Sequence, residues 1–79
     1  MVEMDRAIVM VTLEPDTGMT PLEEVRKIPG VIEAHILYGP YDAYVMVEAK
    51  NISRIQDIVI NEIRSINGIL STMTSFIAE

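Results

Sequence analysis

Turn residues divide the chain into segments, four of which have the hydrophobic pattern of a β-strand. Residues 7–13 are uncharged and rich in β-branched side chains, and the run is too short for a typical helix. Residues 43–49 return from a turn at 39–42, and residues 69–78 are rich in hydroxyl groups. Residues 31–38 alternate in polarity, with one face formed by Ile32, Ala34, Ile36 and Tyr38.

A short helix is predicted between the first two strands. Thr20 is the expected N-cap residue, Pro21 takes the first helical position, and Glu23 completes a capping box. Pro29 and Gly30 end the helix, because proline cannot continue it and glycine suits the C-terminal cap.

The most regular helical pattern lies between the third and fourth strands. Capping side chains at residues 50–53 precede it, and Asn67-Gly68 supplies the stop. Apolar residues recur in between at three- and four-residue spacing, at Ile52, Ile55, Ile58, Val59, Ile63 and Ile66. This pattern predicts a second, longer helix with one apolar face.

The order of these elements is β-α-β-β-α-β. Two right-handed β-α-β units with a hairpin between them interleave most simply as a four-stranded antiparallel sheet with both helices on one face. The sequence therefore predicts an α+β chain with the ferredoxin-like arrangement. We expect the first and third strands, which are nearly all apolar, to be central, and the second and fourth to be edges.

Both faces of the predicted central strands are apolar. In the third strand Val45 and Val47 point to one face, and Tyr44 and Met46 point to the other. Two helices cover only one face, so the second would expose a wide apolar patch to water. We therefore expect a homodimer that packs two sheets together. A monomer with an unusually apolar open face is the alternative.

Length and charge restrict the possible functions. A chain of 79 residues has room for one domain, 1–79, and its net charge of −6 repels phosphate backbones and anionic lipid headgroups. We expect no direct nucleic-acid binding and no membrane association. The chain has neither an apolar run of about 20 residues nor the basic start of a signal peptide, which predicts a cytoplasmic protein.

Catalytic chemistry has little support in the sequence. There is no cysteine, and the single histidine, His35, cannot form a zinc site unaided. The sequence contains no glycine-rich phosphate loop, no nucleophile elbow and no cluster with metal-ligand spacing. It therefore predicts a protein that is not an enzyme and that uses no metal or cofactor.

One segment carries more functional groups than a hairpin needs. Residues 38–44 place three tyrosines around the carboxylate of Asp42. An aspartate can pair an ammonium group, free amides near Gly39 can receive a carboxylate, and hydroxyls of the last strand can add hydrogen bonds. These groups suit an amino-acid ligand. The alternative is a turn in which Gly39 and Asp42 have conformational roles only.

These residues also resemble a known family. The pattern Gly39-x-Tyr41-Asp42 lies between two aliphatic strands, and an amphipathic helix and the run Asn67-Gly68-Ile69-x-x-Thr72-x-Thr74 follow it. This combination is similar to the effector-binding domain of the Lrp/AsnC regulators over nearly the whole chain. The resemblance implies a dimer built through the sheets, a ring of dimers that is commonly an octamer, and an amino-acid effector bound between neighbouring dimers.

The resemblance leads to a specific expectation for the site. We expect Asp42 to bind the ammonium group of the effector and Tyr41 to shape the wall of a pocket between dimers. Amides of the Gly39 turn and the hydroxyls of Thr72 and Thr74 would serve the other polar groups of the ligand.

One departure from the family is large. Its full-length members begin with a DNA-binding helix-turn-helix domain, whereas six residues precede the first strand predicted here. We therefore expect a stand-alone effector domain that senses an amino acid and acts through partners, which include full-length Lrp/AsnC regulators. The alternative is an accessory module without a ligand of its own that co-assembles with such regulators.

Overall fold

The computed structural model describes residues 3–78 and contains the predicted elements in the predicted order. A π-helical segment, η1, directly extends the second helix. The elements are β1 (Asp5–Leu13), α1 (Thr20–Arg26), β2 (Val31–Ile36), β3 (Ala43–Ala49), α2 (Ile52–Asp57), η1 (Ile58–Ile63) and β4 (Ile69–Phe76).

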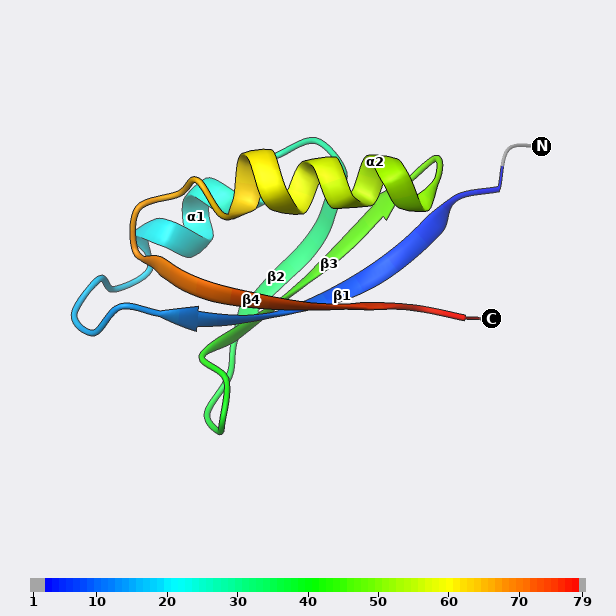
Figure 1. The fold of residues 1–79 in the computed structure, drawn as a ribbon. Coiled ribbons are helices and arrows are strands. Elements are labelled where there is room, and N and C mark those ends of the chain that lie inside the picture. The colour runs from blue at the N-terminus through cyan, green and yellow to red at the C-terminus, as the bar shows by residue number, and fades with distance from the viewer. Residues whose placement is uncertain (1–2, 79) are drawn as a thin grey trace.

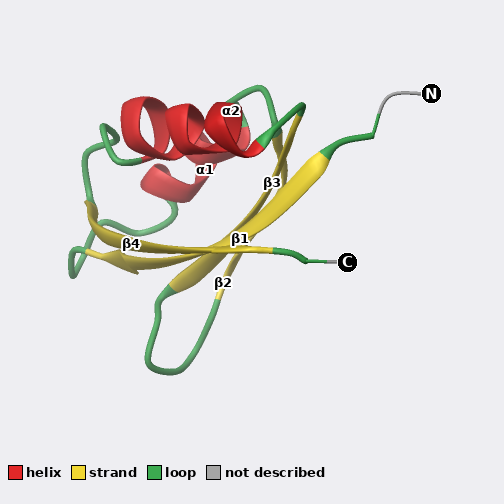
Figure 2. Cartoon of the chain, turned by 45° about the vertical axis from the view of Figure 1, so that its right-hand side comes forward, coloured by secondary structure: helices red, strands yellow, loops and turns green. Residues whose placement is uncertain are grey.

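The four strands form one antiparallel sheet in the order β2-β3-β1-β4. Both helices lie on the same face of this sheet, and no other element among residues 3–78 covers the opposite face (Figure 1; Figure 2). The β2–β3 hairpin projects beyond the sheet on the side away from the helices (Figure 1). The ferredoxin-like fold is therefore confirmed, with β1 and β3 central and β2 and β4 at the edges.

The core is a single aliphatic layer between the sheet and the helices. Alternate residues of the central strands are fully buried, because successive side chains point to opposite faces. Leu22, Val25, Ile55 and Ile63 cover them from the helices. The buried residues of the central strands are Ala7, Val9, Val11, Ala43, Val45, Val47 and Ala49.

The two helix starts differ in how they are capped. Asn51 caps α2 as expected, and its side-chain oxygen accepts a hydrogen bond of 2.8 Å from the Arg54 amide. The predicted cap of the first helix was wrong. Met19 occupies the N-cap position without a side-chain hydrogen bond, and Thr20 is already helical. Pro21, which is buried, fixes the start of α1 by its restricted backbone instead.

The second strand is shorter and less regular than its polarity pattern predicted. Its register against β3 shifts between Val31 and Glu33, which marks a bulge. Ala34 is buried on the helix side, but Ile32 is 52% exposed. Tyr38 lies beyond the end of β2 and is fully exposed. The predicted apolar face of this segment is therefore wrong at both ends, because the bulge and the hairpin interrupt the alternation.

Glycine is required in the turn directly before β4. Gly68 has a φ of +98°, and a Cβ atom there would lie 2.7 Å from Pro21 Cγ. We expect Gly68→Ala to lower the free energy of unfolding by about 2 kcal/mol, since left-handed backbone costs an alanine about 1–2 kcal/mol and the overlap adds to this. Urea unfolding at fixed protomer concentration measures the change.

Gly39→Ala is the matched control. Gly39 does not have a positive φ, and a Cβ atom there would meet nothing within 4 Å. The free energy of unfolding of the Gly39→Ala variant should stay within about 1 kcal/mol of the parent value. Equal losses in the two variants would contradict this account of Gly68.

Candidate functional site

Asp42 fastens the β2–β3 hairpin to the end of β1. Its amide donates to the Val11 carbonyl over 2.9 Å, and its carboxylate atom Oδ2 accepts from the Leu13 amide over 2.8 Å. Its carbonyl accepts from the Leu37 amide over 2.9 Å, which closes the hairpin. Within residues 3–78, Oδ2 is the carboxylate oxygen of Asp42 that makes a hydrogen bond. Asp42 therefore has a structural role and retains a second oxygen, Oδ1.

Gly39 lies at the exposed tip of this hairpin. Because its φ is not positive, its backbone conformation is one that other residues adopt readily. The space where a Cβ atom would stand is also empty. The conformational explanation for glycine thus fails here, and what glycine provides is open access to the backbone of the turn.

Tyr41 reaches across the sheet from the hairpin. Its hydroxyl donates to Met73 Sδ on β4 over 3.3 Å. Met73 pairs with Met10 on β1, and the alternation along β1 places both on the face that the helices leave open, because Val9 and Val11 point into the core. Tyr41 is therefore a half-buried aromatic side chain at the margin of the open face.

Thr72 and Thr74 lie on the opposite face from Tyr41. They pair with Val11 and Val9, whose side chains point toward the helices. Together they line a groove of about 330 Å³ between β4 and η1, with Gln56, Val59, Ile60, Arg64 and Phe76 as its other walls. The structure thus brings Gly39, Tyr41 and Asp42 together on the hairpin but places both threonines elsewhere.

The open face of the sheet is apolar at its centre. Its central side chains are Ile8 and Met10 from β1 and Tyr44 and Met46 from β3, all half-buried, and Met73 on β4 is 55% exposed. This confirms the predicted division of the third strand into two apolar faces. A patch of this kind, uncovered by any layer, is typical of a contact surface.

A polar cluster borders this patch on the β2 side. The Tyr44 hydroxyl donates to Glu33 Oε1 over 2.9 Å, and His35 Nε2 lies 3.2 Å from the same oxygen. The rings of His35 and Tyr44 are 5.4 Å apart. The hydrogen bond to Glu33, with partial desolvation and the negative charge of Glu33, raises the pKa of Tyr44 above its ordinary value of 10.0.

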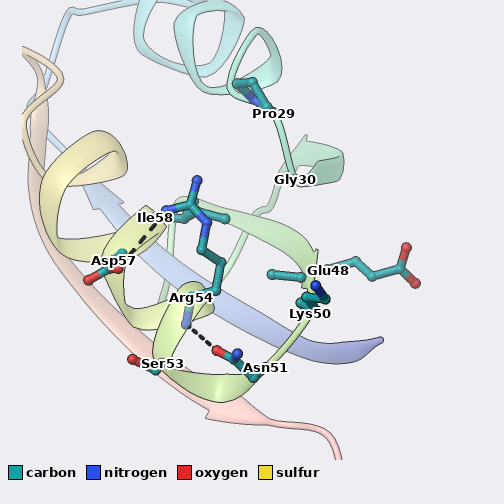
Figure 3. A pocket seen from close by; sticks show the side chains of 10 residues that line it. Pro29, Gly30, Glu48, Lys50, Asn51, Ser53, Arg54, Asp57 and Ile58 are labelled. Carbon is teal, nitrogen blue, oxygen red and sulfur yellow. Dashed lines mark hydrogen bonds and ion pairs between the residues drawn. The ribbon is translucent and has the colours of Figure 1, made fainter. Parts of the chain in front are cut away.

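A second concave region lies at the start of α2 (Figure 3). It has a volume of about 500 Å³, and its walls include Pro29, Gly30 and the first turn of α2. Arg54 Nη1 lies 4.0 Å from Asp57 Oδ2 there, and the Glu48 carboxylate points away from this pair (Figure 3). This cleft is open to solvent, and the ion pair in it joins two side chains of the same helix, Arg54 and Asp57.

Sequence reasoning missed two of these features. Strand alternation placed Glu33 and His35 on one face, but only the pairing of β2 with β3 brings Tyr44 to them. The groove beside β4 combines residues far apart in the sequence, and Arg64 within it carries no local signal. Among the residues that the structure describes, no three His, Cys, Asp or Glu side chains are grouped to hold a metal ion. No helix in the described part is both long and apolar enough to span a membrane.

Comparison with known proteins agrees with this fold. Residues 6–79 match the model of the Lrp/AsnC ligand-binding domain, so the chain belongs to this family of regulatory domains. The matched model describes a regulatory ligand-binding domain, in agreement with the prediction of a chain that is not an enzyme.

Two curated relatives are HTH-type transcriptional regulators. One from Pyrococcus furiosus is 39% identical over 71 residues, which cover 86% of this chain and 47% of the relative. The regulator LysM of Saccharolobus solfataricus is 40% identical over 73 residues, which cover 91% of this chain and 51% of LysM. The chain therefore spans about half the length of these relatives.

Solved structures give the same fold. A protein from Thermus thermophilus superimposes with a TM-score of 0.89 at 25% identity, covering 95% of this chain and 94% of that protein. A transcriptional regulator from Neisseria meningitidis, solved in complex with L-Met, superimposes with a TM-score of 0.81 at 20% identity and covers 95% of this chain and 50% of the regulator.

The raised pKa of Tyr44 leads to a spectroscopic prediction. In an alkaline ultraviolet titration, Tyr44 should ionise above the ordinary tyrosine pKa of 10.0, and Tyr44→Phe should remove that late step. Glu33→Gln should move the step to lower pH, because it removes the negative charge beside the phenol. Since the pKa is raised in the folded state, the stabilisation is present below about pH 10 and is lost as the pH rises through the raised value. A late step that survives in Tyr44→Phe would contradict the assignment.

Proposed function

We propose that this chain is an oligomeric sensor domain that binds a small amino acid between subunits and acts in the cytoplasm through partner proteins. Family membership supports a regulatory ligand-binding role. The Neisseria meningitidis regulator, which has the same fold, was solved with an amino acid, L-Met. The net charge of −6 favours action through other proteins over direct contact with DNA.

The observation that carries the amino-acid proposal is the chemistry of the hairpin. Asp42 is held rigidly through Oδ2, which leaves Oδ1 for a charge-assisted hydrogen bond to an ammonium group. Gly39 exposes the turn backbone for a carboxylate, and Tyr41 supplies an aromatic wall. These three residues come from four consecutive positions, 39–42, so their relative placement does not depend on a loop elsewhere.

The position of the threonines favours a site shared between chains. Thr72 and Thr74 face the helix side of the sheet, whereas the hairpin projects from the other side, so one chain cannot close both halves around a small ligand. A site between subunits joins the hairpin of one chain to the β4 groove of another. Such junctions provide concavity that a small domain lacks.

The open face supports a sheet-to-sheet homodimer as the first step of assembly, and an octameric ring of dimers is the larger assembly proposed. Tyr44, Met46 and Met10 would pack against the same residues of the partner. The second candidate function is an accessory module without a ligand that co-assembles with full-length Lrp/AsnC regulators. The structural role of Asp42 toward Leu13 favours this alternative, since it accounts for Asp42 without an effector.

Asp42→Asn separates the two functions. The asparagine side-chain oxygen can still accept from the Leu13 amide, so the fold and oligomer should persist. Loss of the negative charge should weaken amino-acid binding by about 1.5–3 kcal/mol. Calorimetric titration should use the amino acid that most raises the melting temperature in a screen of the common amino acids. An unchanged affinity for the amino acid would show that Asp42 has a structural role only. If no amino acid binds the parent chain, the accessory module is favoured.

Met46→Glu tests the sheet-to-sheet dimer. Each chain of the dimer would then bury one introduced carboxylate at the centre of the open face, close to that of its partner. The cost of burying these charges should dissociate the dimer. Ser53→Glu on the exposed surface of α2 is the control, because it adds the same charge away from the sheet. Light scattering coupled to size exclusion measures the mass. A parent chain that is monomeric at micromolar concentration, or a Met46→Glu variant with the parent mass, would refute this dimer.

A further inference from the structure

The groove between β4 and η1 contains hydrogen-bond donors that have no partner within residues 3–78. Thr72 and Thr74 line this groove and are half-buried. The side-chain hydrogen bonds of the described residues involve neither of these hydroxyls, nor the guanidinium of Arg64 at the same groove. The ion pairs in this range also join other residues. One guanidinium and two hydroxyls can therefore bind a group from outside this chain.

Arg64 has no acidic neighbour along the chain. The positions three and four before it, which lie beside it on the helix, hold Asn61 and Ile60. Glu62 lies two positions before it, a spacing at which helical side chains do not face each other. Residues 65–78 contain no Asp or Glu, although the chain has 12 acidic residues against 6 basic ones. The sequence around Arg64 thus offers its guanidinium no carboxylate.

A cation at this position also has a local structural explanation. Arg64 is the C-cap residue of η1, and its amide donates to the Val59 carbonyl over 2.9 Å. Positive charge at the end of a helix complements the helix dipole. This explanation accounts for the charge of Arg64 but not for the hydroxyls beside it, so the two roles make different predictions for ligand binding.

Apolar side chains form the rest of the groove wall. Val59 is buried, whereas Ile60 and Phe76 are 57% and 40% exposed. Apolar walls reduce the access of water to a bound group, which strengthens its hydrogen bonds to neighbouring donors. Among the described residues that line the groove, Arg64 alone is charged. This combination suits a short aliphatic chain that ends in a carboxylate, because a guanidinium binds a carboxylate through two parallel hydrogen bonds.

We propose that the groove binds the side chain of the effector and that Arg64 selects an acidic amino acid, aspartate or glutamate. This inference rests on the proposed function, in which the hairpin of one chain meets the β4 groove of another. Asp42 and the turn backbone at Gly39 would bind the ammonium and carboxylate groups that all amino acids share. The groove is the part of the site that remains for the side chain, with Arg64 as its specificity-determining residue.

A basic side chain has a rival position in the structure. A cleft of about 470 Å³ beside the hairpin is lined by Glu14, Asp16 and Asp42, and their carboxylates would attract a cation and repel another carboxylate. In the proposed site, however, Asp42 already binds the ammonium group of the effector. The donors of the β4 groove have no such partner, so an acidic side chain in the groove is the better match.

Calorimetric titration of the parent chain tests the class of effector. The probes are glutamate, aspartate, their amides glutamine and asparagine, lysine and leucine. An acidic amino acid should bind on the order of tenfold or more tightly than its own amide, which has the same shape without the charge. Tightest binding of lysine or leucine would overturn this inference and leave the proposed function standing. If none of the probes binds, the proposed function itself is contradicted.

Arg64→Gln tests the specificity-determining residue. It should weaken binding of the acidic amino acid on the order of ten- to a hundredfold and leave binding of the amide nearly unchanged. Arg54→Gln is the matched control, because it removes the same charge from an exposed position of α2 outside the groove, and it should change neither affinity. Equal weakening of the acid and its amide by Arg64→Gln would reveal a structural effect and overturn the role of Arg64.

Arg64→Glu reverses the charge in the groove. This variant should lose the preference for the acidic amino acid and bind lysine more tightly than the parent chain does. A gain of affinity cannot result from misfolding, so this variant decides the question even if Arg64→Gln is unstable. An Arg64→Glu chain that still prefers the acidic amino acid to lysine would overturn the inference.

The two hydroxyls are tested by the double variant Thr72→Val with Thr74→Val. Valine keeps the strand propensity and removes both hydrogen-bond donors. Binding of the acidic amino acid should weaken more than binding of leucine, because a carboxylate uses these donors and an aliphatic side chain does not. An equal change for both ligands would contradict the assignment of the hydroxyls to the side-chain carboxylate.

Discussion

The structure depends on one constraint: the two central strands are apolar on both faces, but the chain has helices for only one. Val9, Val11, Val45 and Val47 are buried beneath α1, α2 and η1, which builds the core. The side chains between them, such as Met10 and Met46, face away and are only half-buried. Hydrophobic burial therefore completes the fold of one chain and leaves a second apolar layer unused. This exposed apolar layer is the observation behind the proposed homodimer.

The same two-sided sheet separates the groups that suit an effector. Asp42, Gly39 and Tyr41 belong to a hairpin that projects away from the helices, while the β4 threonines face the helix side. The hairpin and the groove beside β4 are both accessible, and each is too open to enclose a ligand alone. Association would close them, which couples ligand occupancy to the arrangement of subunits. That coupling is a physical route by which a domain without catalytic groups can transmit a signal to a partner.

The two edge strands of the sheet, β2 and β4, differ in their charged side chains. At β2 a bulge, the Glu33 carboxylate and the Arg26 guanidinium discourage another strand from pairing. At β4 the residues carry no charge.

The sequence by itself determined the element order, the ferredoxin-like topology, a cap for α2 within residues 50–53 and the two faces of β3, because these follow from local periodicity and short-range capping. It did not determine the bulge in β2, the N-cap of α1 at Met19 or the π-helical segment η1, since these depend on packing against other elements. It also grouped Thr72 and Thr74 with the hairpin. Only strand pairing decided that they face the helices, because alternation fixes which residues share a face, while the register with β1 fixes which face that is.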